Sequence, residues 1–452
     1  MTIIDDVHAR EVFDSRGNPT VEVEIRCHNA RSGRAIVPSG ASTGKFEAVE
    51  LRDGDPNRLQ GKGVTRAVKN VNSEIAEVLI GKDAADQQAI DKLLLELDGT
   101  PNKSRLGANA ILGTSLATAY ASAEALGQSP VKRFADIWAA FLPLESKQNR
   151  NRTSLLGQSL QLPLPMVNMI SGGLHAGRNL DFQDFLILPV GATSYRQALE
   201  WIVTCYHQLG KTLNQYGHEG TLTGDEGGYG PKLSGNSDAI NYILEAIEKS
   251  GLEPGHDIAI GLDVASTHFY DADSQTYHLN ATGDAALSSS DVIDLLEEWT
   301  DQFPIVSIED GLAEEDWTGW QELTARLGNR VQLIGDDLFV TNAKRLQQGI
   351  ENNVANSVLI KLNQIGTLTE TLEALKLALE HDYWPVISAR SGETEDTTIA
   401  DLVVATGAGQ LKVGSVSQSE RLAKYNQLLR LEEQLGENAA YHGGTIFQDA
   451  KK

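Results

Sequence analysis

Cysteine and long apolar runs are both scarce in this 452-residue sequence. Its two cysteines, Cys27 and Cys205, form no CxxC pair, which argues against a disulfide framework and favours a reducing compartment. No uninterrupted apolar stretch approaches the ~20 residues that a membrane helix requires. The first residues, MTIIDDVHAREVFDSRG, lack the basic and apolar regions of a signal peptide. We therefore expect a cytoplasmic protein without a membrane partner.

Basic residues are also in the minority. The chain has 38 lysines and arginines against 62 acidic residues, for a net charge of −24. Phosphate backbones bind basic surfaces, so we expect no nucleic-acid partner, whereas an acidic protein can readily collect divalent cations. The sequence also lacks an internal repeat and a glycine fingerprint, and SGASTGK is one residue too short for a phosphate-binding P-loop.

Two patterns of secondary structure divide the chain. In the first part, strands such as PTVEVEIRC precede predicted helices at 63–80, 87–97 and 107–126, which is an α+β pattern. In the second part, short apolar runs alternate with helical segments, which predicts a parallel sheet in a barrel or a doubly wound arrangement. The polar, proline-bounded stretch near 141–160 separates the two. We predict an N-terminal domain at 1–140, a catalytic domain at 141–435 and a tail at 436–452.

Charged residues mark the ends of six apolar runs in the second part. They follow one another at steps of 46, 27, 25, 29 and 22 residues, most of which match one strand–helix unit. Because polar groups at the carboxyl ends of barrel strands converge on one face, we expect these side chains to share a site. The six residues are Asp263, Glu309, Asp336, Lys361, Arg390 and Lys412.

The chemistry of these six residues predicts a metal-dependent site. The three carboxylates offer only oxygen ligands, which suits a hard cation such as Mg²⁺. Lys361 lies within VLIKLNQ, and a lysine beside other cations has its pKa lowered toward that of a base. Arg390, with Ser391 and Lys412, supplies donors for phosphate and carboxylate groups.

Two further strings contribute candidate residues to the same face. The glycine-rich turn TGDEGGYG carries Asp225 and Glu226, and GGLHAGRNLDFQDF carries His175, Gln183 and Asp184. Together with the six strand-end residues, they describe metal-assisted proton abstraction beside a carboxylate. In this scheme cations hold the substrate, Lys361 accepts the proton, and a carboxylic acid on the opposite side assists a leaving group.

The order of these motifs resembles that of the enolases, the phosphopyruvate hydratases of glycolysis. The resemblance runs from DSRGNPTVE to SERLAKYNQLLRLEE and includes SGASTG, GDEGGY, VSIEDG, DDLFVTN, KLNQIG and RSGETED. It implies an N-terminal α+β domain, a C-terminal β/α (TIM-like) barrel, and a homodimer or a higher oligomer. The implied substrate is a small phosphorylated carboxylate, 2-phosphoglycerate.

Residue by residue, the resemblance implies two Mg²⁺ per active site. Asp263, Glu309 and Asp336 would bind one, and Ser42, in a loop that closes over the substrate, would help to hold the second. Lys361 would be the base and Glu226 the acid. The remaining residues of the implied catalytic and substrate-binding set are His175, Asp184, Gln183, Arg390, Ser391 and Lys412.

Three features depart from the family pattern. Ala389 stands where the family usually has a histidine, Asp184 stands where it usually has a glutamate, and the polar stretch at 141–160 is longer than usual. The first two changes leave two alternatives open. One is a lyase of the same superfamily that acts on a related phospho- or phosphono-carboxylate, and the other is a catalytically weak scaffold or binding protein.

Overall fold

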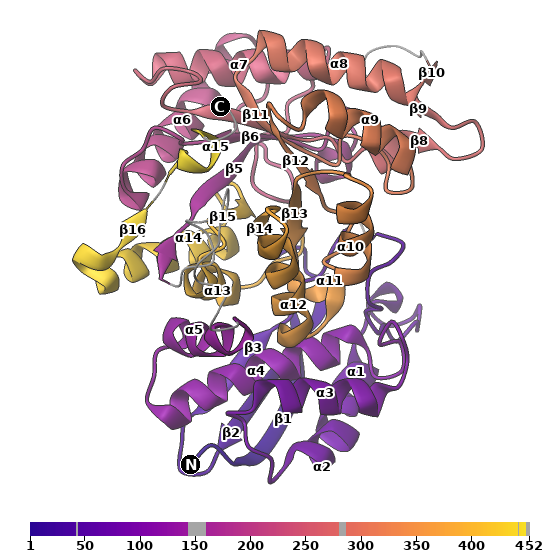
Figure 1. Cartoon of the computed structure of the whole chain (residues 1–452), viewed down its shortest axis with the longest axis vertical. Coiled ribbons are helices and arrows are strands. Elements are labelled where there is room, and N and C mark those ends of the chain that lie inside the picture. The colour runs from indigo at the N-terminus through magenta and orange to yellow at the C-terminus, as the bar shows by residue number, and fades with distance from the viewer. Residues whose placement is uncertain (42–43, 143–159, 280–285, 442, 449–452) are drawn as a thin grey trace.

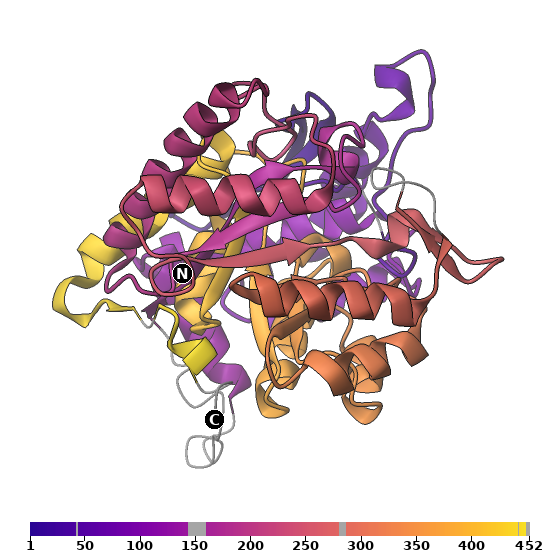
Figure 2. The same cartoon turned by 90° about the horizontal axis from the view of Figure 1, so that it is seen from above.

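The protein folds into two structural domains, which lie at opposite ends of the molecule in Figure 1. The computed structural model describes residues 1–41, 44–142, 160–279, 286–441 and 443–448. In the view from above, the N-terminal domain (indigo to purple) lies behind the strands and helices of the second domain (Figure 2). The predicted domain boundaries stay predictions, and residues 143–159 of the predicted junction lie outside the described residues.

The N-terminal domain pairs a three-stranded sheet with helices, as the sequence predicts. Its antiparallel strands are β1 (Ile4–Phe13), β2 (Pro19–Cys27) and β3 (Ser32–Ile36), in that order. Its helices are α1 (Thr65–Asn70), α2 (Ala76–Leu79), α3 (Gln87–Asp98), α4 (Ala108–Leu126) and α5 (Pro130–Phe141), with a π-helical segment at Val71–Ile75 between α1 and α2. The alanine-rich α4 packs against the sheet so closely that a Cβ at Gly33 would lie 2.0 Å from the backbone of Ala121.

The second domain is a closed barrel of eight strands. Its strands are β5 (Leu164–Ser171), β6 (Asp184–Leu188), β7 (Ala259–Asp263), β11 (Ile305–Glu309), β12 (Gln332–Gly335), β13 (Ser357–Ile360), β14 (Trp384–Ser388) and β15 (Gln410–Gly414). Around the barrel they follow the order β11-β12-β13-β14-β15-β5-β6-β7. Closure confirms the barrel and excludes the doubly wound sheet.

The strand directions confirm the predicted parallel sheet in part. All six predicted apolar runs form barrel strands, and β7, β11, β12, β13, β14, β15 and β5 pair in parallel. The exception is β6, which runs antiparallel to both of its neighbours. The connection from β5 to β6 contains a short 3₁₀ turn at Gly173–Ala176 and no α-helix, whereas a parallel pair usually has a crossover helix. Neither β5 nor β6 belongs to the apolar runs predicted from the sequence.

Helices surround the barrel. They are α6 (Tyr195–Gln215), α7 (Asn236–Lys249), α8 (Ser289–Gln302), α9 (Trp317–Leu327), α10 (Ala343–Glu351), α11 (Leu362–Ile365), α12 (Leu368–Glu380), α13 (Thr398–Thr406), α14 (Ser419–Leu435) and α15 (Thr445–Gln448). Local capping explains several helix starts; for example, Ser288 and Asp291 form a capping box at α8. The short strands are β8 (Tyr270–Asp271), β9 (Thr276–His278), β10 (Ala286–Leu287), β4 (Gln161–Leu162) and β16 (Ala440–Tyr441). Within the described residues, no helix combines the length and the apolar character needed to cross a membrane.

The N-terminal domain contacts the carboxyl ends of the barrel strands. Ser39 and Gly392 exchange backbone hydrogen bonds of 2.8 Å, just beyond the end of β14. Only glycine fits at position 392, because a Cβ there would lie 2.4 Å from Asp14 Oδ2 and 2.6 Å from Ser39 O. This contact places the segment after Ser39 beside the face on which the sequence predicts the site.

Candidate active site

The barrel register brings the three predicted metal carboxylates to neighbouring strand ends. Asp263 and Glu309 are direct partners in the parallel pair β7–β11, and Asp336 follows the end of β12. All three side chains are buried. Burial and the adjacent Asp263 carboxylate raise the pKa of Glu309 well above its usual value. Negative charges this close together require compensation by cations.

Two lysines, the buried Lys412 and the largely buried Lys361, supply positive charge to these carboxylates. Lys412 Nζ lies 2.7 Å from both Asp263 Oδ2 and Glu309 Oε2, while Lys361 Nζ donates to Asp336 Oδ2. Burial would lower the pKa of Lys412, but its two carboxylate partners outweigh it and raise the pKa well above the usual value.

The predicted lowering of the Lys361 pKa is wrong for this arrangement. Burial lowers the pKa, and the cations Arg390 and Lys412 also lower it. The Asp336 carboxylate outweighs these effects, so the Lys361 pKa lies above its usual value. The sequence shows cations near Lys361 but gives no sign of a direct ion pair with a carboxylate 25 residues away.

The carboxylates fit a divalent cation in their chemistry. Asp263 and Glu309 direct oxygens at one cationic point, which the Lys412 ammonium occupies. An oxygen-only set of this kind suits Mg²⁺. Among the described residues, the tightest groups of potential ligand atoms are different ones: Asp310, Asp336 and Asp337, and His175, Asp184 and Glu226. Asp336 is thus in a compact carboxylate group, although not with the two predicted partners.

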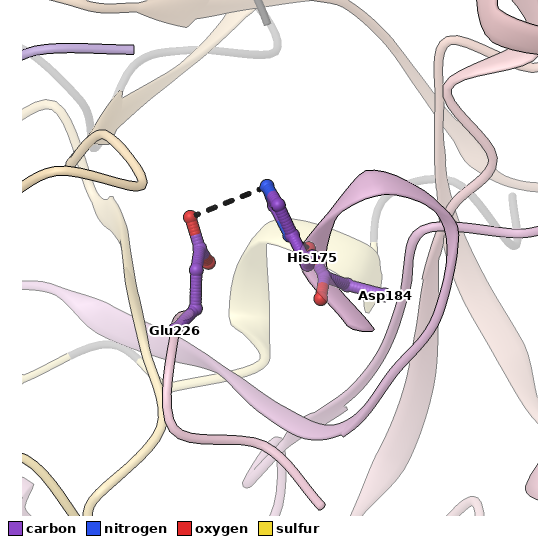
Figure 3. Close-up of side chains that lie close together, drawn as sticks. All are labelled: His175, Asp184 and Glu226. Carbon is purple, nitrogen blue, oxygen red and sulfur yellow. Dashed lines mark hydrogen bonds and ion pairs between the residues drawn. The ribbon is translucent and has the colours of Figure 1, made fainter. Parts of the chain in front are cut away.

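His175 lies between two carboxylates, with Nε2 turned toward Glu226 (Figure 3). Its Nδ1 lies 2.8 Å from Asp184 Oδ2, and its Nε2 lies 4.0 Å from Glu226 Oε1. Burial lowers the pKa of His175, but Asp184 and Glu226 outweigh it and raise the pKa to about 9. For Glu226, burial raises the pKa, but nearby cations, His175 first, bring it below its usual value. The imidazolium therefore stabilises Glu226 in its ionised form.

The Asp184 side chain is directed at His175. Its Oδ1 accepts hydrogen bonds from Asn168 Nδ2 and, at 3.3 Å, from Ser171 Oγ, while Oδ2 faces His175. Burial raises the pKa of Asp184 to about 6, against the opposing effect of His175. The geometry therefore supports a positioning role for Asp184 more than direct contact with a substrate.

Arg390 and Ser391 lie beyond the end of β14, next to the N-terminal domain. The Ser391 Oγ accepts a hydrogen bond of 2.7 Å from the Ala41 amide. Arg390 Nη1 donates to Asn363 Oδ1 at 2.8 Å and to Glu47 Oε2 at 3.1 Å, and Nη2 donates to Glu47 Oε1 at 3.2 Å. Two domains therefore build this cationic end of the site.

A small cavity of about 20 Å³ joins these groups. It brings together eight of the predicted site residues. Asp184, Glu309 and Asp336 do not line it but contact His175, Lys412 and Lys361, which do. Ala389 is the one apolar residue of the lining. Ser42 lies outside the described residues. The lining comprises His175, Gln183, Glu226, Asp263, Lys361, Ser388, Ala389, Arg390, Ser391 and Lys412.

Several buried residues that the sequence analysis did not assign hold this site in place. Asp310 accepts hydrogen bonds of 2.9 Å from the Asp336 and Asp337 amides, and Gln364 Nε2 donates to Asp336 Oδ1 at 2.8 Å. Arg421 donates to the carbonyl groups of Arg390 and Ser391. Each lies within a quoted motif, but nothing local in the sequence indicates the distant atom that it contacts.

Comparison with known protein families agrees with this architecture. Residues 4–133 match the model of the enolase N-terminal domain, and residues 159–450 match the model of the enolase C-terminal TIM barrel domain. The two matches follow one another along the chain and coincide with the α+β domain and the closed barrel. Since the barrel match alone covers more than half of the sequence, the chain belongs to the enolase family.

Proposed function

We propose that this enolase-family lyase catalyses the Mg²⁺-dependent, reversible dehydration of 2-phosphoglycerate to phosphoenolpyruvate. One observation carries the proposal: Lys361, the candidate base, and Glu226, the candidate acid, line one buried cavity together with Arg390 and Ser391. A base, an acid and an anion-binding end are the groups that this elimination requires. A homodimer or higher oligomer in the cytoplasm is the accompanying expectation.

The proposed roles follow from where each side chain lies. Lys361 accepts the proton from C2, and Glu226 assists departure of the hydroxide from C3. Because His175 favours the ionised form of Glu226, this carboxylate must take up a proton before it can act as the acid. Arg390 and Ser391 bind the phosphate, while Gln183 and Lys412 bind the rest of the substrate. The Lys361 ammonium must lose its proton first. Weakening of the Lys361–Asp336 ion pair on substrate binding would lower the pKa of Lys361 and so favour this loss of a proton.

Asp263, Glu309 and Asp336 would hold one Mg²⁺, and Ser42 would contribute to a second. When bound, the ions would supply positive charge to the substrate carboxylate as its negative charge develops, a contribution on the order of 10 kcal/mol at an effective dielectric of 20. The family membership and the buried carboxylates support divalent metal use in general. The identity and the number of the ions belong to the proposal.

Ultraviolet absorbance provides the direct test. Purified protein with 2-phosphoglycerate and Mg²⁺ should form phosphoenolpyruvate at an enzyme-like rate, and excess chelator should stop the reaction. Restoring Mg²⁺ serves as the control for chelator damage. Failure to form product under conditions in which the protein binds Mg²⁺ would contradict the proposed substrate.

A second candidate function is the same elimination on a related phospho- or phosphono-carboxylate. The two departures from the family pattern near Glu226 favour this function. Ala389 lines the cavity, and Asp184 is held by Asn168 and Ser171. A panel of such compounds, compared by kcat/KM, discriminates the two. A non-catalytic binding role would instead give ligand binding by calorimetry without turnover of any panel member.

A further inference from the structure

Glu47 connects the N-terminal domain to both ends of the candidate active site. Its Oε1 accepts hydrogen bonds from the Gly44 amide at 3.0 Å and from Arg390 Nη2 at 3.2 Å, and its Oε2 accepts from Arg390 Nη1 at 3.1 Å. Both charged side chains are almost completely buried, with 3% of Arg390 and 7% of Glu47 exposed. A buried two-point ion pair of this kind fixes the plane of the guanidinium.

The same carboxylate also reaches the metal-binding end. Gln364 Nε2 lies 3.4 Å from Glu47 Oε1 and 2.8 Å from Asp336 Oδ1, so one amide group links the two carboxylates. The Gln364 side chain is held from its other side by Thr341 Oγ1, at 2.7 Å from Gln364 Oε1. A displacement of Glu47 therefore alters the surroundings of Arg390 and of Asp336 together.

Glu47 also lines a second, larger cavity. That cavity measures about 440 Å³, and its lining includes Glu47, Asn363 and the start of α4. Glu47 and Asn363 both bind Arg390, which lines the active-site cavity. The Glu47 charge, which faces open space on one side, is thus held in place by Arg390 and by the Gly44 amide.

We propose that Glu47 is a positioning residue with two effects on Arg390. It fixes the orientation of the guanidinium group, and its negative charge weakens the attraction of this arginine for phosphate. The inference rests on the proposed function in so far as Arg390 binds the substrate phosphate. Glu47 lowers ground-state affinity, because its charge opposes that of the phosphate. It raises turnover, because it keeps the guanidinium and, through Gln364, the Asp336 carboxylate in place.

Titration with inorganic phosphate in the presence of Mg²⁺, followed by calorimetry, tests the charge effect without any turnover. Glu47→Gln keeps the size of the side chain and removes its charge, so we expect the phosphate Kd to fall by about 10-fold. With the best substrate, kcat of the same variant should also fall by about 10-fold or more. Glu47→Asp keeps the charge but shortens the reach, so it should lower kcat and leave the phosphate Kd within about threefold.

Glu96→Gln is the control with the same substitution. Glu96 lies on α3 of the same domain, its side chain is 63% exposed, and it pairs with Lys92. Its phosphate Kd and kcat should stay within about twofold of the wild type. An unchanged or weaker phosphate affinity in Glu47→Gln overturns the inference, as does an absence of phosphate binding in both wild type and variant. Wild-type protein that binds phosphate but does not convert 2-phosphoglycerate overturns the proposed substrate alone.

Discussion

Lys361 and Lys412 are the two ammonium groups of the site, and they have different carboxylate partners. Lys412 is shared by Asp263 and Glu309, whereas Lys361 pairs with Asp336. A lysine held by two carboxylates is poorly suited to accept a proton, because its charged form is strongly favoured. The pair with a single carboxylate makes Lys361 the better candidate for the base.

Lys361→Ala should lower turnover by about 100- to 10,000-fold, the usual contribution of a positioned base. Folding should survive, since Asp336 keeps its hydrogen bond from Gln364. Steady-state kinetics and circular dichroism measure the two effects. Lys92→Ala, at a side chain that is 76% exposed, is the control. A variant that is unfolded or fully active would refute the role of Lys361.

Ala389→His should lower kcat/KM for the protein's best substrate by about 10-fold or more. The imidazole adds five ring atoms and intrudes on a cavity of about 20 Å³ whose wall is otherwise polar. Ala389→Ser, which adds a single atom, should stay within about fivefold. A faster Ala389→His enzyme would mean that the alanine is a loss of a useful group and not part of a rebuilt site.

At the scale of elements, the turn after β11 sets the position of the turn after β12. Asp310 has a left-handed backbone conformation, with φ of 43°, and its two carboxylate oxygens accept the amides of Asp336 and Asp337. Two adjacent strand ends are thereby tied together. The orientation of Asp336 depends on this tie as well as on its own strand.

Asp310→Asn should weaken Mg²⁺ binding by about 10-fold or more, the typical effect of losing a residue that orients a ligand. The amide has one acceptor oxygen in place of two, so one of the two backbone N–H groups faces an NH₂ donor instead of an acceptor. Calorimetric titration with Mg²⁺ measures the change independently of turnover. Asp301→Asn, a 64% exposed site, provides the comparison. Equal affinities in the two variants would exclude a positioning role for Asp310.

At the scale of the whole molecule, buried polar contacts join the two domains. Asp91 of α3 accepts a hydrogen bond of 2.9 Å from the Thr369 amide at the start of α12, and Ser115 of α4 accepts one of 3.0 Å from the Leu368 amide. Asp91 is fully buried, and burial raises its pKa from 3.8 to about 6. Its protonation is therefore linked to folding.

Because the folded state holds this proton more tightly, Asp91 favours folding below pH ~4, and this contribution is lost as the pH rises to about 6. The wild type should lose stability relative to Asp91→Asn over this window, by about 1.4 kcal/mol per pH unit at most and about 3 kcal/mol in total. Denaturant unfolding of both proteins between pH 4 and 7 measures the difference. A difference that does not change with pH would contradict the raised pKa.

Several parts of the fold and the site could be predicted from local sequence. The helices at 65–79, 87–98 and 108–126 and the six charged barrel strands follow from periodicity and from strand–helix alternation. Strand β6 could not be recognised in the same way. Its antiparallel direction depends on the connection from β5 and on its pairing with β5 and β7 in the closed barrel.

By itself, the sequence determined the α+β and barrel pattern, the acidic charge and the residue types that converge at the strand ends. These properties depend on spacing along the chain, which sequence displays directly. Only the tertiary structure decided that Lys361 pairs with Asp336, that Asp184 faces His175 and that Glu47 binds Arg390. Glu47 and Arg390 are 343 residues apart, and contacts at such separations exist only once barrel closure and domain packing bring the segments together.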